Sequence, residues 1–139
     1  MGRKNMTSGA YSKTTQGVRI TVQPQYLDAQ SSPDANHYVW AYRVEIENLG
    51  DVQVQLINRT WLITDSNGKT EVVKGPGVVG EQPVLQAGEA FSYTSGAPLS
   101  TPSGFMRGSY GMVWQDGHGF EAEIPAFSLD SPFAPKSVN

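Results

Sequence analysis

Cysteine is absent from the 139 residues, histidine occurs only twice, and no long apolar run is present. Without thiols the chain cannot form disulfides, thiolate nucleophiles, iron–sulfur clusters or thiolate zinc sites. No segment approaches the roughly 18 apolar residues of a membrane-spanning helix, and no apolar signal core follows Met1. We therefore expect no membrane partner and a cytoplasmic location, which the lack of cysteine fits.

Charge is also scarce. Only 17% of the residues are charged, and the formal net charge is −3 at pH 7. A nucleic-acid surface needs clustered lysine and arginine to neutralise phosphates. The one dense basic group, Arg3 and Lys4 with Lys13, lies in a polar N-terminal segment. We therefore expect no nucleic-acid partner.

The length predicts one domain with a single hydrophobic core. Residues 1–15 are polar and small, so ordering them would cost backbone entropy without burying apolar surface, and we expect a flexible N-terminal arm. We expect the single domain to span residues 16–130 and the C-terminal tail to span residues 131–139.

Alternation of apolar and polar residues is the strongest pattern that the chain does contain. The clearest run places five apolar residues on one face of a strand, namely Tyr38, Trp40, Tyr42, Val44 and Ile46. Similar but shorter runs begin at Val18, at Phe91 and at Met106. Residues 95–104 are expected to form a long connection, and Pro125 is expected to interrupt the last pair of strands.

The alternation changes phase within the run that begins at Val52. Val54 and Leu56 share one parity, whereas Trp61 and Ile63 share the other. Either a β-bulge between residues 57 and 60 or a passage of the strand from one sheet to the next would produce this shift.

Seven to nine short strands, separated by turn residues, predict an all-β fold without an amphipathic helix. One polar and one apolar face on each strand is typical of antiparallel sheets covered on one side. We therefore predict a two-sheet antiparallel β-sandwich of the fibronectin type III or immunoglobulin type, with a closed barrel as the alternative. Trp40 and Trp61 are expected in its core.

Gly75, Gly77 and Gly80 have the spacing G-x-G-x-x-G. A dinucleotide fingerprint would continue into a helix, and a phosphate-binding P-loop would continue with lysine and serine or threonine. Here Glu81, Gln82 and Pro83 follow, so neither architecture fits. Two interpretations stay open: the glycines supply positive φ or close approach, or exposed amides hold an anion such as a nucleotide or pyrophosphate, with Lys74 at the entrance.

Candidates for catalysis and metal binding are few. His37 and His118 both fall in predicted turns, and no serine lies in a G-x-S-x-G elbow. The carboxylates of the predicted strands lie on outward faces, where solvated side chains are the rule. We therefore predict no catalytic residue, no metal site, no cofactor and no enzymatic activity.

The chain resembles the bacterial ApaG (also called CorD) family from about residue 15 to residue 132. The resemblance rests on the loop motif G-x-G-V-V-G-E-x-P and on segments spread along the chain, including Asn58-Arg59-Thr60-Trp61, Thr101-Pro102 and Phe127-Ser128-Leu129. It implies a fibronectin type III-like sandwich and a link to cobalt and magnesium tolerance. It also implies a pyrophosphate-binding role for the loop and, from eukaryotic relatives, a protein-interaction module.

From the residues and the resemblance together we predict a non-enzymatic binding module with a protein partner. The alternative is a nucleotide or pyrophosphate sensor that uses Gly75, Gly77 and Gly80. A sandwich with an unprotected edge strand can also pair with a second copy of itself, so a homodimer is expected as a further partnership.

Overall fold

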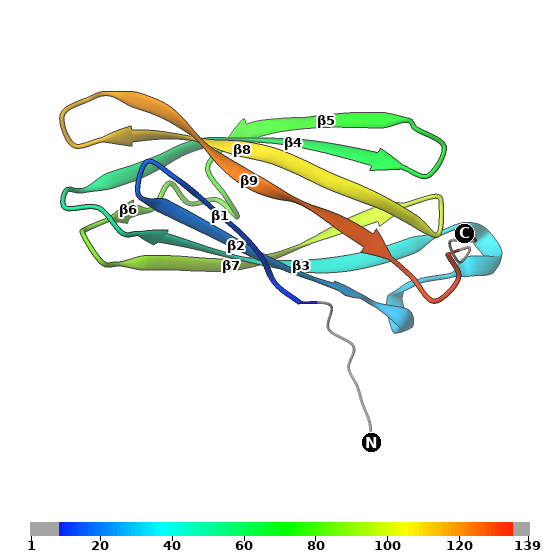
Figure 1. Ribbon diagram of the computed structural model, residues 1–139. Coiled ribbons are helices and arrows are strands. Elements are labelled where there is room, and N and C mark those ends of the chain that lie inside the picture. The colour runs from blue at the N-terminus through cyan, green and yellow to red at the C-terminus, as the bar shows by residue number, and fades with distance from the viewer. Residues whose placement is uncertain (1–8, 135–139) are drawn as a thin grey trace, which may run out of the picture.

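Two antiparallel sheets lie face to face in the computed structural model, which describes residues 9–134 (Figure 1). The first sheet has the order β1-β2-β3-β7, formed by β1 (Tyr11–Thr15), β2 (Val18–Tyr26), β3 (Tyr38–Asn48) and β7 (Ala90–Leu99). The second has the order β5-β4-β8-β9, formed by β5 (Thr70–Pro76), β4 (Val54–Asp65), β8 (Ser103–Trp114) and β9 (Gly119–Asp130), while β6 (Val84–Leu85) also pairs with β4. The 3₁₀ turns η1 (Asp28–Gln30) and η2 (Pro33–Ala35) join β2 to β3. Neither is long enough to cross a membrane, and no other helix occurs in residues 9–134.

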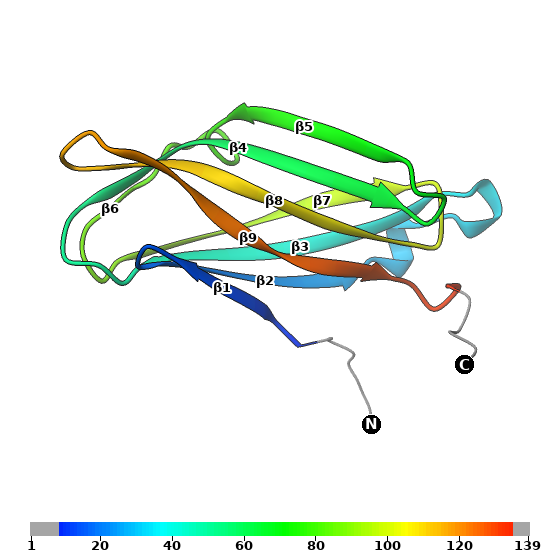
Figure 2. The same ribbon diagram turned by 45° about the horizontal axis from the view of Figure 1, so that its top comes forward.

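The two long sides of the sandwich differ. On one side β1 lies against β9, where Lys13 Nζ is 2.8 Å from Glu123 Oε1 and the Tyr11 and Phe127 rings are 6.1 Å apart (Figure 2). On the other side each sheet ends in an edge strand, β7 in the first sheet and β5 in the second. We call this second side the open side.

The predicted all-β, two-sheet antiparallel sandwich of fibronectin type III-like architecture is confirmed. A closed barrel is wrong, because no strand of one sheet pairs with a strand of the other in residues 9–134. The five apolar residues predicted to share a face of β3, Trp40 among them, are all buried, and so is Trp61. Alternation therefore identified the core face of the longest run correctly.

Three expectations about connections need correction. Residues 11–15 of the expected flexible arm form β1, which pairs with β2 along its whole length; residues 1–8 of that arm lie outside the described residues. Residues 95–99 continue β7 and residues 103–104 begin β8, so the expected long connection is only a short turn. β9 runs without a break through Pro125. Its pairing with β8 shifts register between Met106 and Gly108, and Pro125 lies at this shift. A strand tolerates the missing proline amide at such an irregularity.

The phase shift in β4 is a β-bulge. Leu56 lies opposite Met112 and Asn58 lies opposite Gly111, which leaves Ile57 without a partner residue on β8. β4 stays in the second sheet along its whole length, so the alternative of a passage between sheets is wrong.

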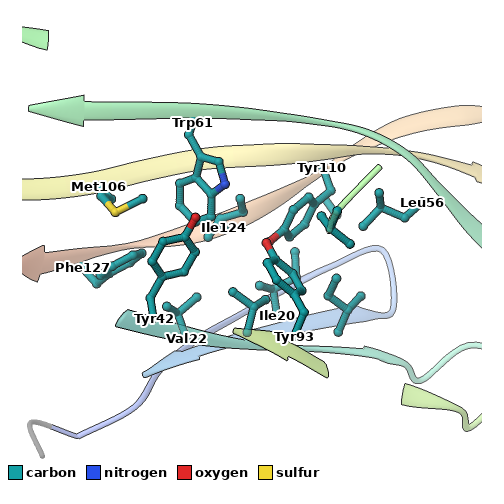
Figure 3. Close-up of a cluster of buried hydrophobic side chains, with 14 of the residues drawn as sticks. Ile20, Val22, Tyr42, Leu56, Trp61, Tyr93, Met106, Tyr110, Ile124 and Phe127 are labelled. Carbon is teal, nitrogen blue, oxygen red and sulfur yellow. The ribbon is translucent and has the colours of Figure 1, made fainter. Parts of the chain in front are cut away.

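Aromatic rings fill the space between the sheets (Figure 3). Trp61 is 2% exposed and meets Tyr42, Tyr110 and Phe127 at ring-centroid distances of 5.2, 6.4 and 6.0 Å. The hydroxyls of Tyr93 and Tyr110 point at each other across the core and share a hydrogen bond. Each hydroxyl thus satisfies the other inside an otherwise apolar region.

Removing one of these two hydroxyls should cost more than removing both. Tyr110→Phe leaves the buried Tyr93 hydroxyl without its partner, and we expect a loss of about 1–3 kcal/mol in the free energy of unfolding. The double variant Tyr93→Phe/Tyr110→Phe removes both polar groups and should recover most of that loss. Urea titration of the two single variants, the double variant and the wild type measures this double-mutant cycle. Additive losses would contradict the mutual hydrogen bond.

The same pair predicts an alkaline limit to stability. Burial raises the pKa of both the Tyr93 and the Tyr110 hydroxyl, whereas tyrosines of the unfolded chain ionise near a pKa of about 10. Above about pH 10 the unfolded state binds fewer protons than the folded state. The contribution of the pair to the free energy of unfolding is therefore complete below about pH 10 and is lost as the pH rises toward the raised pKa values of the folded state. The free energy of unfolding should therefore decline more steeply between pH 9.5 and 11 (an interval set by that pKa of about 10) in the wild type than in the double phenylalanine variant.

Candidate functional site

The three glycines of the G-x-G-x-x-G motif occupy different positions at the end of β5. Gly75 lies within β5, opposite Arg59 of β4. Gly77 follows the strand with φ 62°, and Gly80 lies in the loop with φ 80°. We call residues 77–83 the glycine loop. The glycine loop connects β5 to β6, and both of these strands pair with β4; β6 lies opposite Val54 and Gln55.

Gly77 is required by close approach. A Cβ atom at this position would lie 2.2 Å from the carbonyl oxygen of Glu81, far inside contact distance. At Gly75 a Cβ would lie 3.0 Å from the Arg59 guanidinium nitrogens, whereas at Gly80 it would meet nothing within 4 Å. The interpretation of the glycines as positive-φ or close-approach positions is therefore confirmed: Gly75 gives room, Gly80 gives φ, and Gly77 gives both.

The bulge in β4 anchors the glycine loop. The carbonyl of Ile57, the residue that the bulge leaves unpaired with β8, accepts hydrogen bonds from the Gly77 amide at 2.9 Å and from Gln82 Nε2 at 2.8 Å. Gln55 Nε2 donates to the Gln82 carbonyl at 3.1 Å, and Val78 is 1% exposed in the core. The loop is therefore fixed at its base by side-chain and backbone contacts.

A tight turn forms the tip of the loop. Val78 and Glu81 exchange two backbone hydrogen bonds of 2.8 Å, which closes the turn around Val79 and Gly80. Val79 has φ 44° and a side chain that is 58% exposed. A β-branched residue in this left-handed region is a true outlier. The chain thus holds an apolar side chain in solvent in a strained backbone conformation.

The hydrogen bonds limit what the loop can do with an anion. The amides of Gly77, Val78 and Glu81 already donate to carbonyls, so they do not point into a cradle. Those of Val79 and Gly80 donate to no backbone carbonyl of residues 9–134. Glu81 is exposed beside them. The loop is followed by β6 rather than by a helix, as its residues predicted.

Arg59 is the cation nearest the base of the loop. Its Nη1 donates to the carbonyls of Pro76 at 3.0 Å and Gly77 at 2.9 Å. All 13 Asp and Glu side chains of the sequence lie within residues 9–134, and none comes within 4.0 Å of the guanidinium. The positive charge of Arg59 also acts on the buried Tyr42. Burial raises the pKa of the Tyr42 hydroxyl, and the charge of Arg59 partly opposes that rise. Arg59 is thus half-buried with carbonyls but no carboxylate as partners.

The histidines lie away from this region and from each other. His37 pairs with Ser32 beside η2, while His118 lies in the β8–β9 turn with Nδ1 2.9 Å from Asp116 Oδ2. Hydrogen bonding to Asp116 raises the pKa of His118. Both side chains of this ion pair are highly exposed, as expected of turn residues. Within residues 9–134 no three His, Asp or Glu side chains gather as metal ligands do.

Arg59 and Val79 are the features that the sequence interpretation did not single out. A signal for Arg59 was present: it has the same parity as Trp61, which places a charge on the inward face of β4. No pattern in the sequence indicates the positive φ of Val79, because valine rarely adopts it.

Comparison with known proteins gives a consistent family. The ApaG domain family model matches residues 28–114. Protein ApaG of Rhodospirillum centenum is 62% identical over 122 residues, 88% of this chain and 94% of that protein. Protein ApaG of Paramagnetospirillum magneticum is 59% identical over 129 residues, 93% and 99% of the two chains. A crystal structure of an ApaA protein from Bordetella pertussis superposes with a TM-score of 0.81 at 46% identity, covering 84% of this chain and 95% of that one.

Proposed function

The chain belongs to the ApaG domain family, and from this premise we propose that it is a non-enzymatic binding module whose glycine loop contacts a protein partner. The relatives carry the name of the family and no enzymatic name. The resemblance first noted in the loop motif extends over the whole domain. Family membership gives the fold, while the proposed activity rests on one feature of the loop.

That feature is Val79. An L-residue in the left-handed region costs about 1–2 kcal/mol, and leaving an isopropyl group in solvent recovers none of it. Strain of this kind persists where the surrounding structure enforces it, and it is common at ligand contacts. Asparagine or glycine would relieve it at the same turn position. A strained, exposed valine is therefore well suited to bury its side chain against a partner.

Val79→Asn separates stability from binding. We expect the variant to raise the free energy of unfolding by about 1 kcal/mol, because asparagine tolerates positive φ. The same variant should weaken capture of the partner by about tenfold, the effect of a lost interface contact worth over 1 kcal/mol. The control is Val72→Asn, which removes a similarly exposed valine, 53% against 58%, from β5 rather than from the glycine loop.

Quantitative affinity capture from cells tests the proposal. Wild type and Val72→Asn should recover the same protein in the same amount, Val79→Asn should lose it, and the recovered protein should bind the purified domain directly. Equal recovery by all three baits would refute the contact at Val79.

Arg59 supports a second candidate function, the recognition of pyrophosphate or a nucleotide phosphate beside the loop. Its guanidinium has no carboxylate partner, and a bidentate arginine is a preferred ligand for phosphate oxygens. Only the Val79 and Gly80 amides remain for the same anion, so this candidate rests mainly on the side chain.

Titration of labelled protein with pyrophosphate tests the second candidate. Binding should shift the amide signals of residues 77–80 and the Arg59 Nε signal, and Arg59→Met should abolish the shifts. Arg107→Met, on β8 in the outward-facing position opposite Leu62, is the control. Unmoved signals at millimolar pyrophosphate would exclude this function and leave the protein-binding proposal intact.

A further inference from the structure

The edge strand β7 differs from the other edge on the open side in carrying no charge, and its one proline, Pro98, lies next to its end. Its ten residues, Ala90–Leu99, include no charged side chain. β5 carries Glu71 and Lys74 and ends at Pro76. Natural sheets guard exposed edges with charges, prolines or bulges, because unpaired amides and carbonyls recruit another strand. An uncharged edge of this length therefore marks a surface for strand pairing.

The backbone groups of β7 that face away from β3 can be identified from the register. Asn48 N donates to the Glu89 carbonyl at 2.9 Å just beyond the end of the ladder, which places the hydrogen-bonded pairs at the even-numbered residues of β3 and the odd-numbered residues of β7. Such pairs alternate along an antiparallel ladder. Residues 91, 93, 95 and 97 therefore bond to β3, whereas Ala90, Ser92, Thr94 and Gly96 direct their amides and carbonyls outward. Pro98 belongs to the outward set, where its missing amide costs no bond to β3.

We propose that a second copy of this chain pairs with β7 through an antiparallel β7–β7 contact whose two-fold axis passes at Tyr93. In this register Ser92 faces Thr94 of the second copy, and Ala90 faces Gly96. Four outward pairs form, each exchanging two hydrogen bonds, and Pro98 lies outside the paired stretch. The two first sheets then become one continuous sheet across the dimer.

A second copy is the occupant that the edge fits best. The outward set is uncharged, so its repetition across a two-fold axis brings no like charges together. The register keeps exposed side chains opposite exposed ones and inward side chains opposite inward ones, as pairing in one sheet requires. The same strand supplies both halves of the contact, which is the condition for an isologous interface. This pairing is independent of the binding proposed for Val79.

Sedimentation velocity over a concentration series tests the dimer. The mass should rise with concentration from 15.1 kDa to twice that value. Thr94→Pro removes an outward amide at the centre of the contact and should abolish the dimer without loss of a bond to β3. Val72→Pro makes the corresponding change on β5 and should leave the dimer intact. A wild-type monomer at millimolar concentration, or a dimer broken by Val72→Pro but not by Thr94→Pro, would overturn the proposal.

A charge pair tests the register with variants that keep the backbone unchanged. Ser92 lies opposite Glu45 on β3, and Thr94 lies opposite Arg43. In Ser92→Lys and in Thr94→Glu the introduced charge therefore faces an opposite charge within its own sheet. Alone, each variant brings two like charges together diagonally across the axis and should weaken the dimer by about threefold to tenfold. In the mixture, the introduced ammonium group of one chain lies directly opposite the introduced carboxylate of the other, and the mixture should dimerise more strongly than either variant alone. A mixture that associates no better than its components overturns the register.

Discussion

Gly77→Ala is expected to lower the free energy of unfolding by about 2–5 kcal/mol. The left-handed φ of 62° costs an alanine about 1–2 kcal/mol. The new Cβ would also lie 2.2 Å from the Glu81 carbonyl oxygen, and relieving such overpacking typically costs about 1–3 kcal/mol more. The backbone must move to relieve it, which weakens the hydrogen bond from the Gly77 amide to Ile57.

Gly80→Ala separates the two contributions. Gly80 has a similar φ of 80°, but a Cβ there meets nothing within 4 Å. We therefore expect a loss of only about 1–2 kcal/mol, the conformational cost alone. Urea titrations followed by tryptophan fluorescence give both values. Equal losses for the two variants would show that the Glu81 carbonyl yields freely, and that the turn is less rigid than its hydrogen bonds indicate.

Trp61→Ala is expected to destabilise the domain by about 3–5 kcal/mol, the range measured for truncating a large buried aromatic side chain. Trp61 is 2% exposed and meets three aromatic rings edge-on, from Tyr42, Tyr110 and Phe127. These rings come from both sheets, so the cavity would open at the interface between the layers, where the backbone of two ladders resists collapse.

Two comparisons define this effect. Trp61→Phe keeps an aromatic ring in the same space and should cost clearly less than the alanine variant. Phe105→Ala, at a position that is 43% exposed on the same sheet, should change stability by no more than about 0.5 kcal/mol. Thermal or urea unfolding of the three variants provides the measurement. A loss at Trp61 as small as that at Phe105 would mean that the inter-sheet aromatic cluster contributes little.

The candidate site was only partly predictable. Glu81, Gln82 and Pro83 after the motif predicted a loop at Gly77 and Gly80 and excluded both standard phosphate-binding architectures. The structure agrees, because β6 and not a helix follows the loop. Gly75, in contrast, lies in β5, and its role depends on Arg59, sixteen residues earlier in the chain. The strained φ of Val79 was not predictable, because the flanking bond pair between Val78 and Glu81 imposes it against the preference of valine.

The sequence by itself determined which residues of each strand face the core. Successive side chains of a strand point to opposite faces, so the parity of the apolar residues of β3 was enough. The parity change after Leu56 located an irregularity in β4, and the strand pairing then identified it as a bulge. Only the tertiary structure decided which strands form the edges, which side of the sandwich stays open, and where the loop is anchored. These features depend on pairings between segments far apart in the chain. The free energy of such pairings comes from contacts that no local pattern records. The glycine loop illustrates the division: its composition predicted a turn, but the carbonyl of Ile57, freed by a bulge in another strand, fixes its place.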